Sequence, residues 1–222
     1  MSKLSVLAVA VLAGTSVAQA ASVGVDEGAT WLGYMNVFAL PSDGGGFQFG
    51  SPWGTPDLNA NFNAGTHQLT LSPNTIGDPN PYWYIGGGGP GAAGNKIMEA
   101  NLYQETTDIY NGQLVTFSGT VLSNSFTSAH RVYAFIKDFA ADYSSFNETR
   151  VELTAAGGFS IDLATLGVAG RHVQWGFQTV GVNVWTTDTA PFGNMVIATI
   201  PAPASLALVG MGVLASGRRR RA

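Results

Sequence analysis

The part of the chain between residues 21 and 199 has no sustained helical period. Apolar and polar residues alternate there over short segments, which is the period of a half-buried β-strand. In residues 115–122, for example, Val115, Phe117 and Val121 fall on one face and hydroxyl-bearing residues fall on the other. Clusters of glycine, proline and asparagine separate the segments and favour tight turns. The sequence therefore predicts an all-β fold.

Nine segments are predicted to be strands, and one of them also indicates its place in a sheet. Residues 131–139 carry apolar side chains on one face and Tyr133 and Phe135 on the other. Because both faces suit burial, we expect this strand to be central. The nine segments are residues 31–40, 68–71, 97–104, 115–122, 131–139, 150–153, 159–163, 173–180 and 194–199.

The composition favours one stable domain over residues 21–199. The 222-residue sequence has no cysteine, so its stability must come from a hydrophobic core. Abundant aromatic residues, glycine, asparagine and threonine, with few lysines and glutamates, are typical of sheets joined by tight turns. We expect an antiparallel two-sheet β-sandwich that is jelly-roll-like, flanked by an N-terminal signal helix and a short C-terminal transmembrane helix. An up-and-down barrel is the alternative.

The N-terminus has the three parts of a Sec signal peptide over residues 1–20. Lys3 supplies the positive region, residues 4–13 the apolar region, and Ala18 and Ala20 the small residues of a cleavage site. The apolar run is short for a membrane span. We therefore expect export, with cleavage after Ala20; a buried N-terminal helix is the alternative.

The C-terminus, residues 200–222, has a different three-part pattern. Two prolines around Ala202 hold the chain extended and accessible, because proline continues neither a helix nor a ladder. Residues 204–217 are apolar but shorter than the ~20 residues that span a bilayer upright. A basic cluster follows and is expected to stay cytoplasmic. The residues of this pattern are Pro201, Ala202, Pro203, Arg218, Arg219, Arg220 and Arg221.

Taken together, these three parts resemble a PEP-CTERM sorting signal in its Pro-Ala-Pro variant. The resemblance implies recognition by an exosortase, a membrane-embedded cysteine protease that cuts near the Pro-x-Pro motif. It implies an intermediate anchored in the inner membrane, followed by release or attachment at the cell surface, often in bacteria that make exopolysaccharide. An ordinary tail anchor is the alternative.

Removal of both ends would leave a strongly acidic body. Residues 21–200 keep all fourteen acidic residues but only five of the ten basic ones, which gives a formal charge of −9. An acidic surface without basic clusters argues against nucleic acid and anionic lipid as partners of the body. We expect the charge to keep an exported domain soluble.

The sequence contains no recognisable catalytic motif, and we expect no enzymatic activity. The aromatic residues suggest instead a glycan-stacking site. The loop of residues 79–84 is the best candidate platform, with Trp185 in a second loop. The candidate glycan-binding residues are Tyr82, Trp83, Tyr84 and Trp185, and packing in the core is the alternative for each.

Oxygen-bearing side chains at every second position from Asp57 resemble the start of a calcium loop. Phe62 stands where an EF-hand needs glycine, so the segment is not an EF-hand. We expect no cofactor beyond a possible structural calcium ion, and an Asn-rich turn is the alternative. The candidate ligands are Asp57, Asn59 and Asn61, with Asp138 and Asp142 at a second place.

Two functions of different classes therefore remain. The first is a structural or interaction protein of the cell surface or extracellular matrix, associated with exopolysaccharide. The second is a carbohydrate-binding module with a defined glycan site. Solvent-facing, coplanar rings at Trp83 and Trp185 would favour the second function.

Overall fold

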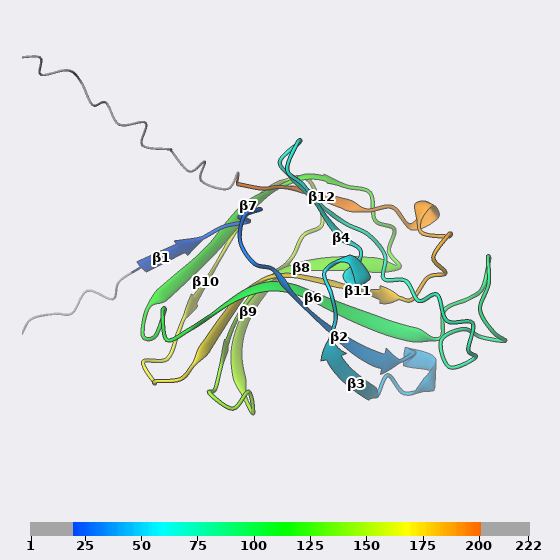
Figure 1. The fold of residues 1–222 in the computed structure, drawn as a ribbon, viewed down its shortest axis with the longest axis horizontal. Helices are drawn as coiled ribbons and strands as arrows, with labels where there is room; N and C mark the ends of the chain where they lie inside the picture. Colours follow the sequence, from blue (N-terminus) through cyan, green and yellow to red (C-terminus); the bar gives the residue numbers. More distant parts are fainter. Residues whose placement is uncertain (1–19, 201–222) are drawn as a thin grey trace, which may run out of the picture.

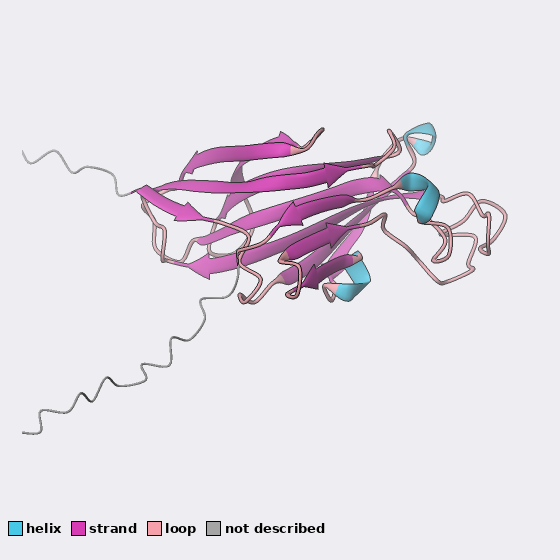
Figure 2. Cartoon of the chain, turned by 90° about the horizontal axis from the view of Figure 1, so that it is seen from above, coloured by secondary structure: helices cyan, strands magenta, loops and turns pink. Residues whose placement is uncertain are grey.

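The computed structural model describes residues 20–200, which form two six-stranded β-sheets packed face to face (Figures 1 and 2). The all-β sandwich predicted from the sequence is confirmed. The predicted sorting tail, and the signal peptide apart from Ala20, lie outside the described residues. Within residues 20–200, every helix is too short and polar to cross a bilayer.

The two sheets draw their strands from the whole described chain. Three short 3₁₀ helices lie in the connections: η1 (Pro41–Asp43), η2 (Pro56–Leu58) and η3 (Ala190–Phe192). The first sheet contains β1 (Ala20–Val23), β4 (Ala60–Asn63), β5 (Gln68–Leu71), β7 (Leu114–Asn124), β10 (Gly157–Ala164) and β12 (Met195–Ala198). The second contains β2 (Leu32–Ala39), β3 (Phe47–Pro52), β6 (Lys96–Thr107), β8 (His130–Phe139), β9 (Phe146–Glu152) and β11 (His172–Val182).

The last eight strands pair in a nested pattern. β5 pairs with β12, β6 with β11, β7 with β10, and β8 with β9, all antiparallel. The remaining contacts order the second sheet as β3-β2-β6-β11-β8-β9, with the long strands β6 and β11 at its centre. In Figure 1, the edge strands β3 and β9 lie on the same lower side of β6 and β11, so this sheet is curved.

One pairing departs from the predicted antiparallel arrangement. β1 runs parallel to β7, with Ala20 opposite Leu114 and Val23 opposite Phe117. β12 contacts β7 further along, around Val121. The connection after β1 crosses to β2 in the other sheet, so no hairpin imposes an antiparallel direction on β1.

Aromatic and aliphatic side chains from both sheets fill the space between them. Val115, Phe117 and Val121 are buried on the face that their alternation predicts. Phe117 packs edge-on against Phe159 and Phe177, with ring centroids 5.3 and 5.5 Å away. The fold is thus held by a continuous core that joins the two sheets.

Candidate functional site

The outer face of the second sheet carries an unusual set of side chains. On β6, Met98, Ala100 and Leu102 are in the core. Because side chains alternate along a strand, the residues between them face outward. An outer face is normally well solvated, yet several of its side chains are almost fully buried here. The outward residues of β6 are Glu99, Asn101, Tyr103 and Glu105.

A groove of about 580 Å³ lies over this face. It receives side chains from β2, β3, β6, β8, β9 and β11, and from the loop between β8 and β9. The volume is within the range of small-molecule sites. The lining residues are Tyr34, Asn36, Pro52, Glu99, Asn101, Tyr103, Glu105, Lys137, Phe139, Tyr143, Phe146 and Gln174.

A row of hydrogen bonds crosses the sheet along one side of the groove. The Asn36 side-chain amide donates to Glu99 Oε1 at 2.9 Å. Asn101 Oδ1 accepts from Lys137 Nζ at 3.2 Å and from Gln178 Nε2 at 3.0 Å. These side chains come from four adjacent strands, and each fixes the orientation of the next. The row therefore offers polar atoms that are already positioned.

Lys137 is the buried cation of the groove. Its ammonium lies 3.6 Å from Glu148 Oε1 and 4.6 Å from the centre of the Phe135 ring. Burial lowers the pKa of Lys137, while the charges of Glu148 and Glu99 act in the opposite direction. The two carboxylates and the aromatic ring thus hold this cation inside the sheet surface.

Tyr143 covers the other end of the groove. Its ring stacks on His172 with centroids 4.3 Å apart and planes 8° from parallel, and its hydroxyl donates to Glu105 Oε1 at 3.0 Å. The second oxygen of Glu105 accepts from Gln174 Nε2 at 2.6 Å. Burial and the Glu105 carboxylate raise the pKa of Tyr143 to about 12.

The backbone of Tyr143 is left-handed, with φ of 58°, which is uncommon for a residue with a large side chain. Tyr143 lies in the tight β8–β9 hairpin, where this conformation turns its ring back over the sheet. The contacts to His172 and Glu105 offset the cost of the conformation. The local strain therefore places an aromatic ring at the mouth of the groove.

Further aromatic side chains lie between these polar ends. A methyl group added at Gly50 would lie 2.8 Å from Tyr34 Cε1, so the Tyr34 ring rests directly over the edge strand. Burial and the neighbouring Glu105 raise the pKa of Tyr103, which keeps its phenol neutral. The groove thus combines neutral phenols and flat rings with fixed amide and carboxylate groups.

The spacing of the two carboxylates of β6 that line the groove, Glu99 and Glu105, does not suit two-carboxylate hydrolysis. Glu99 and Glu105 are six residues apart on one strand, which corresponds to roughly 20 Å. Glycosidases place their paired carboxylates about 5–9.5 Å apart. These two groups therefore cannot act together on one bond, and each is already engaged by protein donors.

The structure corrects part of the predicted aromatic platform. Tyr84 is fully buried, and its hydroxyl lies within hydrogen-bonding distance of the carbonyl oxygens of Ile76 and Val184. Its prediction as a glycan-stacking residue is wrong because the ring has no exposed face. Trp185 is half-buried and packs edge-on against Tyr84 at 5.4 Å.

The other two rings of the platform pack against neighbours. Tyr82 is 38% exposed, but Lys96 Nζ lies 4.4 Å from its ring centre. Trp83 is half-buried, and its ring meets Tyr82 at 88° and Phe49 at 78°. These near-perpendicular contacts stabilise the 79–84 loop without forming a row of coplanar exposed rings.

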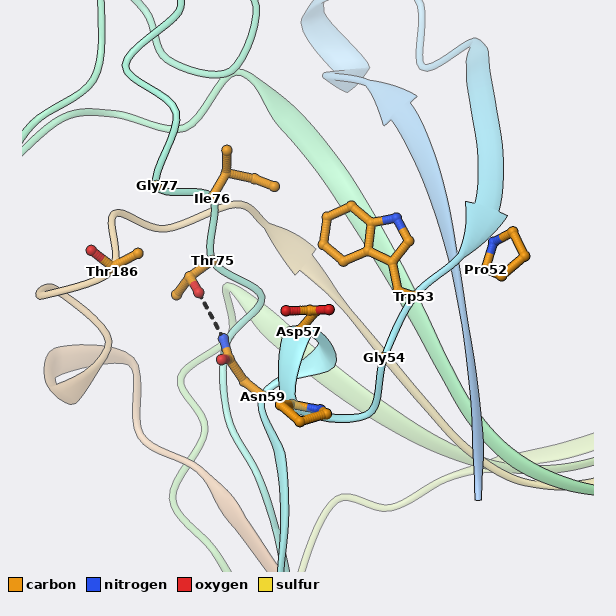
Figure 3. Close-up of a pocket in the computed structure, with 10 residues that line it drawn as sticks. Pro52, Trp53, Gly54, Asp57, Asn59, Thr75, Ile76, Gly77 and Thr186 are labelled. Carbon is orange, nitrogen blue, oxygen red and sulfur yellow. Dashed lines mark hydrogen bonds between the residues drawn. The ribbon is translucent and has the colours of Figure 1, made fainter. Parts of the chain in front are cut away.

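The predicted calcium residues near Asp57 lie on the flank of the sandwich. Asp57 is exposed on η2, and Asn59 follows it in a left-handed conformation. The Asn59 amide donates to Pro73 O at 2.6 Å and to Thr75 Oγ1 at 3.0 Å (Figure 3). Asn61 is exposed on β4. Asp57 and Asn59 line one flank cavity together, and Asn59 and Asn61 line the next.

The structure places the second pair of predicted calcium residues, Asp138 and Asp142, in different environments. Asp138 is fully buried and accepts from Arg171 Nε at 2.7 Å and from the Leu166 backbone N–H at 2.8 Å, so both its oxygens are engaged. Asp142 is exposed in the hairpin and accepts from Ser144. Within residues 20–200, no cluster of three or more His, Asp or Glu side chains is arranged to hold a metal ion.

The groove itself was missed at the sequence level, although a signal for it exists. Glu99, Asn101, Tyr103 and Glu105 occupy every second position opposite the buried residues of the same strand. The aromatic second face of residues 131–139 is a second signal, but by itself it indicates only burial. The two patterns lie on strands separated by β11, so only the sheet order brings them together.

Comparisons with known proteins add no assignment. The chain matches no protein-family model, no curated protein and no solved structure.

Proposed function

We propose that the groove over the second sheet binds a carbohydrate, and that the protein is an exported surface or matrix component. The observation that carries the proposal is the groove's lining, in which aromatic rings stand beside amide and carboxylate groups fixed by mutual hydrogen bonds. Sugars offer apolar C–H faces and directional hydroxyl groups. Flat rings and positioned polar atoms are complementary to both.

The charges favour a neutral glycan. The groove is lined by Glu99, Glu105 and Lys137, with Glu148 and Arg150 beside them, and the five groups sum to a single negative charge. The surrounding body is also acidic. A uronic-acid polymer would therefore meet like charge, whereas a neutral sugar would accept and donate hydrogen bonds without this cost.

The strand order supports the same function by an analogy of fold. We infer that β5 to β12 form a jelly roll, because their nested pairs alternate between the two sheets in the manner of that fold. Lectin domains are among the proteins that use jelly rolls. The analogy raises the expectation of sugar binding, but the groove's chemistry carries the argument.

Export and sorting complete the proposal. A Sec signal peptide and a PEP-CTERM-like tail would deliver the domain outside the inner membrane, with an exosortase as the processing partner. Ile200, the last residue described, is held on the domain by two backbone hydrogen bonds. Its N–H donates to Val25 O at 2.7 Å, and its carbonyl oxygen accepts from Glu27 N–H at 3.2 Å. These bonds hold the C-terminal end of the described chain against the residues that follow β1.

The test of sugar binding is an immobilised panel of neutral and anionic glycans probed with the purified protein. We expect binding to at least one neutral glycan and none to uronic-acid polymers. Tyr143→Ala removes the ring at the groove mouth and should weaken binding about tenfold, which is the effect of losing one aromatic stacking contact.

Tyr82→Ala is the matched control, since it removes an exposed ring outside the groove. Its binding should equal that of the unaltered protein. Equal loss in both variants, or binding that resists Tyr143→Ala, would place the glycan elsewhere. The absence of binding to every glycan of the panel would contradict the proposed function.

A further inference from the structure

One lining residue of the groove, Pro52, also takes part in a second cavity. This residue ends the edge strand β3, faces the groove opposite Tyr34, and also lines a separate cavity on the flank of the sandwich. Trp53 follows directly after β3 and lines the flank cavity. Pro52, at the edge of the second sheet, is therefore common to the linings of the two cavities.

The flank cavity has a volume of about 560 Å³ and its own aromatic ring. Trp53 is half-buried, and its indole N–H donates to Ser51 Oγ at 3.0 Å, which fixes the ring plane. Figure 3 shows Trp53, Asp57, Asn59 and Thr75 around the same space. The bond from Asn59 to Thr75 holds two polar side chains of the cavity together.

A third cavity of about 500 Å³ extends the path across the flank. It shares four lining residues with the second cavity and adds hydroxyl and amide groups from β4 and from the segments around it. Asp57 is the only ionisable group that lines either flank cavity. The shared residues are Pro56, Asn59, Thr75 and Thr186, and the added polar residues are Asn61, Ser72 and Thr189.

We propose that the groove and the two flank cavities form one track for a linear, neutral polysaccharide. The inference rests on the proposed sugar-binding function and specifies its ligand as a polymer instead of a short sugar. The arrangement of the cavities supports this, because the groove shares Pro52 with the first flank cavity and that cavity shares four residues with the second. Trp53 is the stacking ring of the flank, as Tyr143 is of the groove.

The test is isothermal titration of the purified full chain with neutral oligosaccharides of increasing length. The probes are the di-, tetra-, hexa- and octasaccharides of β-1,4-glucan, β-1,3-glucan, β-1,4-mannan and α-1,4-glucan. For the glycan series that binds, the affinity should continue to rise from the tetrasaccharide to the octasaccharide. Trp53→Ala should weaken octasaccharide binding about tenfold and leave tetrasaccharide binding unchanged.

A second variant tests the flank cavity without altering Trp53, in case Trp53→Ala disturbs the fold. Thr186 is exposed, so Thr186→Arg fills the flank cavity without disturbing the core. It should produce the same length-dependent loss, whereas Tyr143→Ala should weaken tetrasaccharide and octasaccharide binding equally. Tyr82→Ala should change neither.

Two failures can be told apart. If a tetrasaccharide binds in the groove but the octasaccharide binds no more tightly, or if Trp53→Ala and Thr186→Arg have no length-dependent effect, the track is wrong and the sugar site remains. If no oligosaccharide of the four series binds, the polymer track is overturned. If the glycan panel also fails, the proposed function falls with it.

Discussion

Tyr143 illustrates how a single side chain shapes the groove. Its left-handed backbone, its stacking on His172 and its bond to Glu105 act together to keep one ring at the mouth. The sequence could not indicate this, because Tyr143 lies in a hairpin between two strands and its partners are distant in the chain. Residue types alone therefore predict the aromatic content but not the groove that Tyr143 lines.

His130 is the residue at which we expect a pH effect on stability. It is 3% exposed, its Nε2 lies 3.0 Å from Val182 O, and its ring stacks on Phe126. Burial lowers the pKa of His130 below its usual value. The folded state therefore favours the neutral ring, and the unfolded chain binds the proton more readily.

The sign of the effect follows from this difference. The stabilisation is present above about pH 6.5, the ordinary histidine pKa, and is lost as the pH falls below it. Thermal unfolding measured from neutral pH into this acidic range should show a falling midpoint for the unaltered protein. His130→Gln cannot titrate and should show a flatter profile. Parallel profiles for the two proteins would contradict the assignment.

Strand prediction worked where one face of a segment is buried. Residues 68–71 were predicted with the observed bounds, and the segments that became β6, β7, β8 and β11 were placed correctly but drawn too short. Their alternation is strong because a buried face tolerates few polar residues. The ends are longer in the structure because cross-strand hydrogen bonds continue after the apolar pattern has ended.

The missed strands lack that pattern. β3 contains Gly50 and Pro52, which are disfavoured in strands, and it survives as an edge strand. β4 is rich in asparagine and was interpreted as part of a calcium loop. β1 adjoins the predicted signal cleavage site, and its parallel pairing with β7 depends on a partner far along the chain. Tertiary pairing, not local propensity, decides all three.

At the scale of the whole molecule, the composition predicts the sandwich but not the groove on the outer face of its second sheet. The groove requires the order β2-β6-β11-β8-β9, which joins strands distant in sequence. The acidic body, by contrast, follows directly from the sequence. Fold class and charge are therefore readable from the chain, whereas the site depends on topology.

The proposed sorting tail makes a separate prediction about the mature protein. Mass spectrometry of the protein from its native host should find an N-terminus at Ala21 and a C-terminus at or near the Pro201–Pro203 motif. The domain should remain folded after processing, because the hydrophobic core described, from Val23 to Ile197, lies between the two expected cleavage points. A mature chain that retains Arg218 to Ala222 would contradict processing by an exosortase.

The central claim is that a neutral glycan occupies the outer face of the second sheet. Its most direct test is a crystal structure of the protein with the best ligand from the glycan panel. The account predicts electron density for the sugar between Tyr34, Tyr103 and Tyr143, with hydrogen bonds to the polar groups of β6. Density at Trp83 or Trp185, with the groove empty, would contradict it.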